Sequence, residues 1–259
     1  MNLPPIATRE EWLAARKELL AKEKELTRAR DALNAQRRTL PMVPIEKDYV
    51  FEEADGLVRL RDIFEGRPQL ILYHFMFEPD AEVGCPGCSF FADNIGHLEH
   101  LHARGTTLAL VSRAPLAKLE AYKKRMGWAL PWYSCLGSDF NYDFHATADE
   151  AIAPVEYNYR SQAELKELGH SYHIKGEQPV LSVFLRDWER VYHSYSCFAR
   201  GLEAPLGLYH LMDLTPFGRG EGWDGMPDLT GEGVHWTRRR GEYGSSVTTA
   251  CHGEAQGAK

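Results

Sequence analysis

The apolar positions near the start of the chain recur with a helical period. Thr8 and Glu11 have the spacing of a capping box, and Pro41 cannot continue a helix. We therefore predict one long helix from residue 8 to residue 40 with a narrow apolar stripe. The stripe either packs on the helix's own domain or joins two copies into a homodimer, and Lys22 and Gln36 interrupt the second apolar row of a coiled coil. Its members are Trp12, Leu19, Leu26, Leu33 and Leu40.

From residue 49 onward, short apolar runs alternate with amphipathic segments. Continuous apolar runs are typical of strands buried on both faces of a sheet, and Asp55-Gly56 marks a hairpin turn. Strands that alternate with helices imply βαβ units and a parallel sheet. The expected order is a hairpin at 49–60, a strand at 69–77, a helix at 89–104, a strand at 106–112 and a helix at 116–126.

The second half of the chain predicts another hairpin and a last helix. Pro179 opens an apolar run at 180–185, and a turn at 187–189 joins it to a strand at 190–196. Before this hairpin, an aromatic loop is expected at 131–148 and a polar insertion at 154–177, and after it a helix at 202–214.

This order of elements is that of the thioredoxin fold. We predict an α/β protein with a thioredoxin-like mixed sheet flanked by helices, in the peroxiredoxin-like variant that adds a hairpin before the site. The expected organisation is an N-terminal helical arm at 1–46, a thioredoxin-like domain at 47–218 and a C-terminal tail at 219–259 that is rich in glycine and charge.

The sequence Cys85-Pro86-Gly87-Cys88 follows the first buried strand and opens a helix. Unpaired N–H groups at a helix N-terminus favour a thiolate, and Pro86 suits a first turn. We expect Cys85 to be the nucleophile and Cys88 to resolve the mixed disulfide. The redox-active Cys85–Cys88 disulfide would need no further cofactor, and Pro86 and Gly87 would contact the substrate.

A metal site is the main alternative for the same two cysteines. His97, His100 and His102 follow on the predicted helix, and two cysteines with two histidines form an ordinary zinc set. Residues nine or more positions along a helix lie far from its start, because each residue rises about 1.5 Å. We therefore expect no metal here, and interpret the histidines as a solvated helix end.

Two further residues are expected near the cysteines. In thioredoxin folds a cis-proline begins the strand that faces the CxxC, and Pro179 stands in that place; an ordinary trans-proline is the alternative. Arg113 follows the second buried strand, where a cation could lower the pKa of Cys85 or hold an anionic group. A solvated arginine in a loop is the alternative.

The aromatic loop offers candidate substrate contacts. Trp132, Phe140 and Tyr142 could form a ligand wall, or could pack in the core. The remaining cysteines carry no spacing signal: Cys135 is expected to be buried, Cys197 has no assigned role, and Cys251 lies in the tail.

Composition narrows the partners and the compartment. The chain has 259 residues, 44% hydrophobic and 26% charged, with a net charge of −7. It lacks the basic footprint that nucleic acid or anionic membrane requires. Five cysteines without a secretory signal at the start favour the reducing cytoplasm, where a CxxC pair serves redox or metal chemistry.

Several blocks of sequence resemble a bacterial thioredoxin-like family, catalogued as domain of unknown function 899 and often labelled predicted dithiol–disulfide oxidoreductase. The resemblance implies the fold and the CxxC but supplies no substrate. Gln178-Pro179-Val180 departs from the Pro-Gly that is common at this point in the family, although Pro179 still matches. The matching blocks are 84–90, 100–104, 111–118 and 137–144, with further matches at 181–184, 195–196, 199–201 and 209–216.

The function predicted from the sequence is thiol–disulfide exchange with an unidentified thiol or disulfide, either a protein or a small molecule. Peroxidase chemistry is one alternative, although Glu82 stands where peroxiredoxins carry Thr or Ser and Pro79 is out of register. A binding protein that kept the fold, or a metal protein that uses the same cysteines, are the others.

Overall fold

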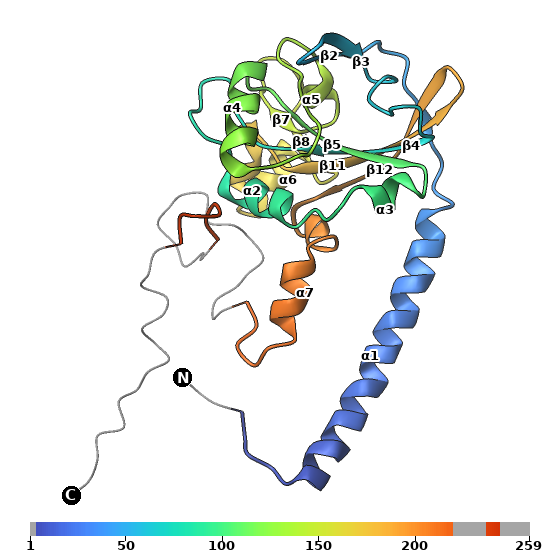
Figure 1. Cartoon of the computed structure of the whole chain (residues 1–259), viewed down its shortest axis with the longest axis vertical. Coiled ribbons are helices and arrows are strands. Elements are labelled where there is room, and N and C mark those ends of the chain that lie inside the picture. The colour runs from blue at the N-terminus through green and yellow to red at the C-terminus, as the bar shows by residue number, and fades with distance from the viewer. Residues whose placement is uncertain (1–3, 220–236, 244–259) are drawn as a thin grey trace, which may run out of the picture.

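A mixed eight-stranded sheet forms the centre of the molecule (Figure 1). The computed structural model describes residues 4–219 and 237–243. The strand order is β1-β12-β11-β4-β5-β6-β2-β3, in which β4, β5 and β6 are parallel and β11 and β12 are antiparallel to their neighbours. The strands are β1 (Val43–Pro44), β2 (Val50–Glu53), β3 (Gly56–Arg59), β4 (Gln69–His74), β5 (Thr106–Ser112), β6 (Trp132–Ser134), β11 (Val180–Asp187) and β12 (Arg190–Phe198).

The helices and short strands complete the fold. Outside the central sheet, β7 (Thr147–Ala148) pairs with β10 (Gly176–Glu177), and β8 (Glu156–Tyr157) pairs with β9 (Arg160–Ser161). The helices are α1 (Arg9–Arg37), α2 (Pro86–Asp93), α3 (Glu99–His102), α4 (Leu116–Met126), α5 (Phe140–Asp143), α6 (Gln162–Glu167) and α7 (Gly207–Asp213), with 3₁₀ turns η1 (Ser171–Ile174) and η2 (Ala199–Glu203). No helix of the described residues is long and apolar enough to cross a membrane.

The four strands β12-β11-β4-β5 form the thioredoxin-like core that the sequence predicted, and that prediction is confirmed. β4 pairs with β5 from Gln69↔Thr106 to His74↔Val111, and both strands are largely buried. β6 and the β2–β3 hairpin extend the sheet beyond β5. The expected aromatic loop therefore contains a core strand, which at three residues is too short to show a period.

Alternate residues of the core strands enter two separate apolar layers. Tyr73 and Leu110 point into the layer beneath α2, α4 and α7, whereas Leu72 and Val111 point into the layer beneath β2 and α5. Figure 1 shows α2 and α7 on one side of the sheet and α5 with β2 on the other. The cysteine pair belongs to the first layer.

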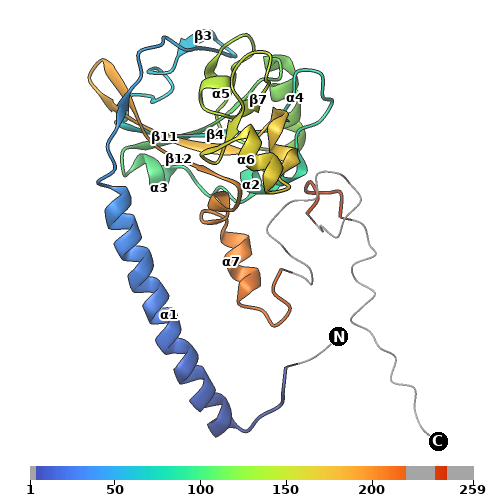
Figure 2. The ribbon, with the colours of Figure 1, turned by 180° about the vertical axis from the view of Figure 1, so that it is seen from behind.

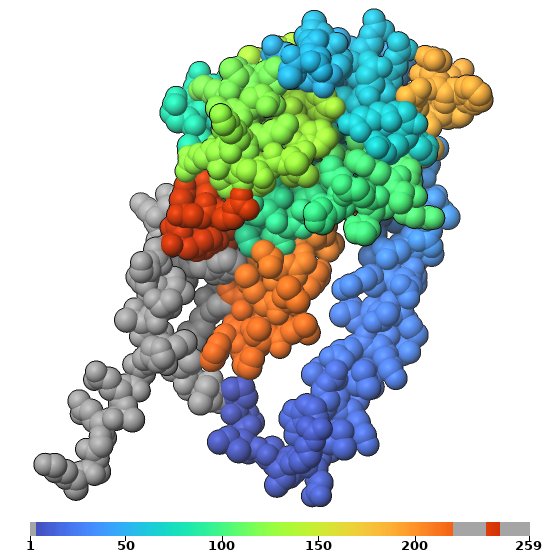
Figure 3. All heavy atoms as spheres, viewed as in Figure 1, coloured from blue at the N-terminus to red at the C-terminus, as the bar shows by residue number. Residues whose placement is uncertain are grey.

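Helix α1 extends away from the domain and touches it at its last turn, where Arg37 lies over the Tyr195 ring at 4.9 Å. The rest of the arm expected at 1–46 joins the sheet through β1. The capping box of α1 is present, because the Glu11 N–H donates to Thr8 Oγ1 over 3.3 Å and the Thr8 N–H donates to Glu11 Oε2 over 2.8 Å. No residue of α1 is buried, and Leu26 in the middle of the stripe is 62% exposed. Figures 2 and 3 show the arm extending away from the sheet. Of the two alternatives, the stripe is not packed on its own domain, and pairing with a second copy stays a prediction.

Two predicted helices are shorter than the sequence indicated. The helix expected at 89–104 is broken into α2 and α3, because Asn94 caps α2: its Nδ2 donates to Phe90 O over 2.8 Å. The same side chain accepts the Leu208 N–H at 2.9 Å, which fixes α7 against α2. The helix expected at 202–214 is divided into η2 and α7 at Pro205, which has no N–H to donate.

Candidate active site

Cys85 occupies the N-cap position of α2, and Pro86 is the first helical residue, so the pair opens a helix as the sequence predicted. The Cys85 carbonyl accepts the Ser89 N–H at 2.9 Å and the Ser89 hydroxyl at 2.8 Å, and the Cys85 N–H donates to Met76 O over 3.1 Å. These bonds tie the start of the helix to the loop that follows β4. Cys85 is partly exposed, whereas Cys88 is buried one turn further along.

The two thiols are shifted in opposite directions. The pKa of Cys85 is lowered from 9.0 to about 7. The largest cause is the hydrogen bond from the Cys88 thiol, followed, after an opposing effect of burial, by the N–H groups of Cys88 and Gly87 and the charge of Arg239. Burial raises the pKa of Cys88 well above its ordinary value. As the pH rises through about 7, Cys85 therefore becomes the thiolate of the pair while Cys88 stays a thiol.

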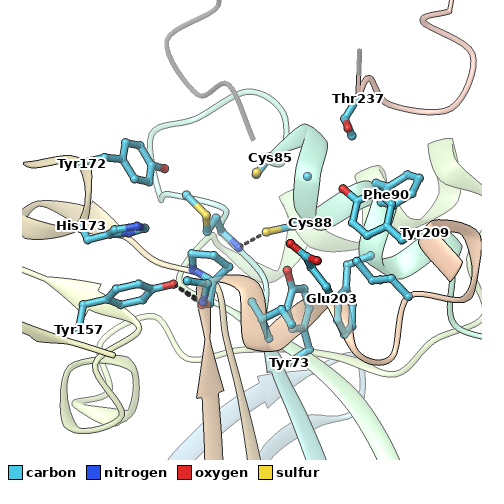
Figure 4. Close-up of a pocket in the computed structure, with 17 residues that line it drawn as sticks. Tyr73, Cys85, Cys88, Phe90, Tyr157, Tyr172, His173, Glu203, Tyr209 and Thr237 are labelled. Carbon is cyan, nitrogen blue, oxygen red and sulfur yellow. Dashed lines mark hydrogen bonds between the residues drawn. The ribbon is translucent and has the colours of Figure 1, made fainter. Parts of the chain in front are cut away.

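The sulfur of Cys88 lies among donors at the floor of the site. The Met76 N–H points at Cys88 Sγ over 3.4 Å, the contact drawn in Figure 4, and the Tyr73 hydroxyl also hydrogen-bonds to this sulfur. Tyr73 is held in place by stacking on Phe91, with ring centroids 3.8 Å apart. These donors would stabilise negative charge on Cys88 when it reacts.

A mostly apolar cavity opens beside the two cysteines. About 80 Å³ of it can be occupied by the centre of a water-sized molecule, within a hollow of about 730 Å³ that includes open solvent. Figure 4 shows Tyr157, Tyr172 and His173 on one side, Phe90, Tyr209 and Thr237 on the other, and the cysteines between them. The remaining walls are Tyr73, Met76, Gly87, Phe91, Pro179, Ala199, Leu202, Glu203 and Leu206.

His173 presents an acceptor nitrogen to this cavity. The Gln178 amide nitrogen donates to two backbone carbonyls, those of Tyr172 and Lys175. Gln178 Oε1 must then accept from His173 Nδ1, 2.7 Å away, so Nδ1 carries the ring proton. Burial lowers the pKa of His173, which leaves the imidazole neutral near pH 7. The ring stacks on Tyr157 with centroids 4.2 Å apart.

Arg239 is the cation beside the cysteine pair. Its Nε and Nη2 donate to the Gly84 carbonyl over 2.8 and 2.6 Å, one residue before Cys85. The sequence analysis missed this arginine because it is 155 positions away along the chain. The only signal was the run Arg238-Arg239-Arg240 within a segment that was expected to be tail.

Arg113, which was expected near Cys85, lies elsewhere. Its guanidinium donates to Glu177 Oε1 over 3.0 Å and covers the Tyr142 ring at 4.9 Å. It lines a different cavity, together with Thr147 and Lys166. Glu177 is a buried carboxylate, so an ion-pair partner is what Arg113 supplies.

The candidate substrate wall at Trp132, Phe140 and Tyr142 is also corrected. The Trp132 indole N–H donates to Ser112 Oγ over 3.0 Å within the core. Phe140 is fully buried in the layer on the opposite face of the sheet, and Tyr142 lies under Arg113. None of the three lines the cysteine cavity, and neither does Pro86, whereas Gly87 does. The aromatic walls come instead from residues that the sequence analysis had not selected.

Pro179 lies in the wall of the cysteine cavity, as its place in the fold predicted. Of the two alternatives for its peptide bond, the structure has the trans form: no peptide bond within residues 4–219 and 237–243 is cis. The Pro179 carbonyl accepts the Tyr157 hydroxyl at 3.1 Å.

The other cysteines are not arranged as reactive thiols. Cys135 is fully buried and points at the Ser112 carbonyl, 3.4 Å away, and burial raises its pKa. Burial likewise raises the pKa of Cys197 to about 11. Cys251 lies outside the described residues. His97 is exposed, and the part of the chain that the structure describes holds no cluster of three or more His, Cys, Asp or Glu suited to a metal ion.

Comparison with known proteins identifies a family. Residues 1–243 match the family described as "Bacterial protein of unknown function (DUF899)". No curated protein matches the sequence.

Three solved structures are similar to this chain. One is the bacterioferritin comigratory protein of Xanthomonas campestris, studied for alkyl peroxide reduction: 13% identity, 66% of this chain and 95% of that one, TM-score 0.40. PrxQ of Xylella fastidiosa is 13% identical, with 62% of this chain and 87% of that one covered and a TM-score of 0.40. Peroxidoxin BcpB of Mycobacterium tuberculosis is 16% identical, with 66% of this chain and 96% of that one covered and a TM-score of 0.37.

Proposed function

We propose that this chain, which belongs to the DUF899 family of bacterial proteins, is a thiol–disulfide oxidoreductase that uses Cys85 and Cys88. One observation carries the proposal: the two thiols lie one helical turn apart, with the pKa of Cys85 lowered and the pKa of Cys88 raised. A thiolate beside a reserve thiol is the arrangement that dithiol exchange needs.

The proposed reaction has two steps. The Cys85 thiolate attacks one sulfur of a substrate disulfide, which forms a mixed disulfide and releases the other substrate sulfur as a thiolate. Cys88 then attacks Cys85 Sγ, and its proton passes to the second substrate sulfur as that leaves. The donors from Met76 and Tyr73 support the charge that develops on Cys88. The substrate gains two electrons and the enzyme becomes the Cys85–Cys88 disulfide.

A peroxidase is the second candidate, because the glutamate that stands where peroxiredoxins carry Thr or Ser is turned to solvent. A carboxylate aimed at Cys85 would raise the pKa of the thiol, but Glu82 is 91% exposed and lies 3.7 Å from Lys118. In this reaction Cys85 would take one oxygen from a hydroperoxide to give an alcohol and a sulfenic acid, which Cys88 would convert to the disulfide with loss of water. Consumption of a hydroperoxide by the reduced protein would distinguish this activity from disulfide exchange.

The test of the proposal is a thiol titration of purified protein in glutathione redox buffers. Wild type should show one two-electron transition, which Cys85→Ser and Cys88→Ser should both abolish. Cys135→Ser, at a buried thiol hydrogen-bonded to Ser112 elsewhere in the core, is the matched control and should leave the transition in place. A transition that survives in Cys85→Ser would refute the proposal. In this proposal the dithiol is the redox group itself, and a reducing compartment such as the cytoplasm would keep it ready to react.

A further inference from the structure

The walls of the cavity beside Cys85 indicate what kind of disulfide it accepts. We infer that the substrate is a small disulfide with an uncharged, apolar organic substituent, which the cavity binds while its sulfur meets Cys85. This inference rests on the proposed function and adds to it the class of substrate.

The first argument is that the cavity's tyrosine hydroxyls nearest the sheet already have partners. The Tyr157 hydroxyl donates to the Pro179 carbonyl over 3.1 Å and accepts the Ala199 N–H at 3.0 Å. The Tyr73 hydroxyl is directed at Cys88. These side chains therefore offer a ligand their ring faces, next to the methyl groups of Leu202 and Leu206. Ring faces and methyl groups favour apolar substituents.

The second argument is charge. The described residues that line the cavity include no lysine or arginine, and their single carboxylate is Glu203. Glu203 is paired with Arg219 at 2.7 Å and with Arg200 at 3.0 Å, so it is neutralised from outside the cavity. Arg239, the cation beside the cysteine pair, is already bound to the Gly84 carbonyl and paired with Glu242 at 3.2 Å. A disulfide that carries carboxylates, such as oxidised glutathione, would therefore lose its hydration in the cavity without an unpaired cation to replace it.

The third argument is access. The cysteines lie between two walls from distant parts of the chain: Tyr172 and His173 on one side, and Tyr209 with Thr237 on the other (Figure 4). The second wall is fixed to α2, because Asn94 at the end of α2 accepts the Leu208 N–H of α7 at 2.9 Å. To reach Cys85, a disulfide in a folded protein would have to fit between these walls together with its polypeptide backbone. A small disulfide needs room only for itself.

The reaction balances with this substrate. Cys85 Sγ⁻ and R–S–S–R give Cys85–S–S–R and R–S⁻, and Cys88–SH then gives the Cys85–Cys88 disulfide and R–SH. Attack requires only that one sulfur reach Cys85 while its R group occupies the apolar cavity. The bound R group then contributes proximity to the first step.

The test compares rates for the reduced full-length protein with rates for dithiothreitol, which removes intrinsic differences in reactivity. Four oxidants are used: dibutyl disulfide, bis(2-hydroxyethyl) disulfide, oxidised glutathione and insulin. We expect the normalised rate with dibutyl disulfide to exceed each of the others by at least about tenfold, since a few buried methylene groups supply that factor. Equal normalised rates would overturn the substrate class and leave the proposed function standing. Failure of all four to oxidise the dithiol would remove both.

Variants locate the effect in the cavity. Leu206→Gln makes one wall polar and should lower the rate with dibutyl disulfide about tenfold while the rate with bis(2-hydroxyethyl) disulfide stays unchanged. Leu211→Gln is the matched control and should change neither rate: Leu211 lies on α7 and is 60% exposed, whereas Leu206, directly before α7, is 6% exposed. Tyr172→Ser, at an exposed position on the opposite wall, should show the same selective loss even if Leu206→Gln folds poorly. Equal losses with both disulfides would count against the inference.

Discussion

Gly84 should be indispensable to the cysteine loop, because a methyl group at this position has no room. A Cβ built on Gly84 would lie 2.6 Å from Cε1 and 2.9 Å from Cζ of Phe75, and 3.3 Å from Tyr122 Cε1. The Phe75 ring is fully buried and packs against Trp132, with centroids 4.7 Å apart, and against Trp128 at 6.0 Å. Because the ring cannot retreat, the backbone at Gly84 must move.

The expected cost follows from this crowding. Overpacking of a well-packed core costs about 1–3 kcal/mol, which for a domain of this size lowers Tm by roughly 2 to 12 °C. The site should respond as well, because Gly84 carries the carbonyl that binds Arg239 and precedes Cys85. Moving this backbone weakens the contacts that lower the pKa of Cys85, so that pKa should rise towards its ordinary value.

Urea unfolding and iodoacetamide alkylation against pH measure the two effects. Gly96→Ala is the matched control, since nothing lies within 4 Å of its added Cβ and its backbone is not in the left-handed region. The control should be unchanged or up to about 1 kcal/mol more stable, because alanine restricts the unfolded chain. If Gly84→Ala unfolds at the same urea concentration as Gly96→Ala, the argument from crowding is wrong.

Three further predictions concern the thiols and the arm. The pKa of Cys85 is lowered on folding, so the reduced protein should gain stability relative to Cys85→Ser as pH rises from 6 to 9 and lose it as pH falls through about 7; urea midpoints at each pH check this. Cys88→Ala should raise the pKa of Cys85 more than Arg239→Gln does, since the Cys88 hydrogen bond is the largest cause of the lowered pKa and Arg239 the smallest; alkylation profiles in the opposite order would contradict this. The exposed stripe of α1 should pair with a second copy in parallel register, where Glu25 faces the partner's Arg30; Leu26→Glu should then give monomers in sedimentation analysis, whereas the charge-matched Thr27→Glu should not.

The elements that the sequence predicted well are those with local signals. α4 has the predicted bounds, because Gly127 adopts the left-handed conformation that ends a helix. The β11–β12 hairpin follows from two apolar runs around a tight turn, and Trp188 at that turn has a φ of 54°. Cys85 at the start of α2 was predictable for the same reason, since a proline at the first helical position is a local signal.

The cavity could not be predicted in this way, because each wall comes from a different part of the chain. Tyr157 and Tyr172 belong to the insertion that received no assigned elements, and Leu206 to the segment expected to be one continuous helix. No period or spacing connects these residues to Cys85. The aromatic residues selected from the sequence lie close together along the chain because they pack in the core. Trp132 and Phe140 are buried on opposite faces of the sheet.

Under the proposed function, reactivity and choice of substrate reside in different parts of the molecule. The backbone of α2 and the neighbouring Cys88 thiol lower the pKa of Cys85, whereas the insertion and α7 enclose the cavity. A change confined to a wall, such as Leu206→Gln, should leave alkylation of Cys85 by a small neutral reagent unaltered and still change which disulfide is reduced. A change at Cys88 should do the reverse and slow every disulfide alike. Finding that wall and thiol variants alter the same measurements in the same proportion would mean that the two parts do not act separately.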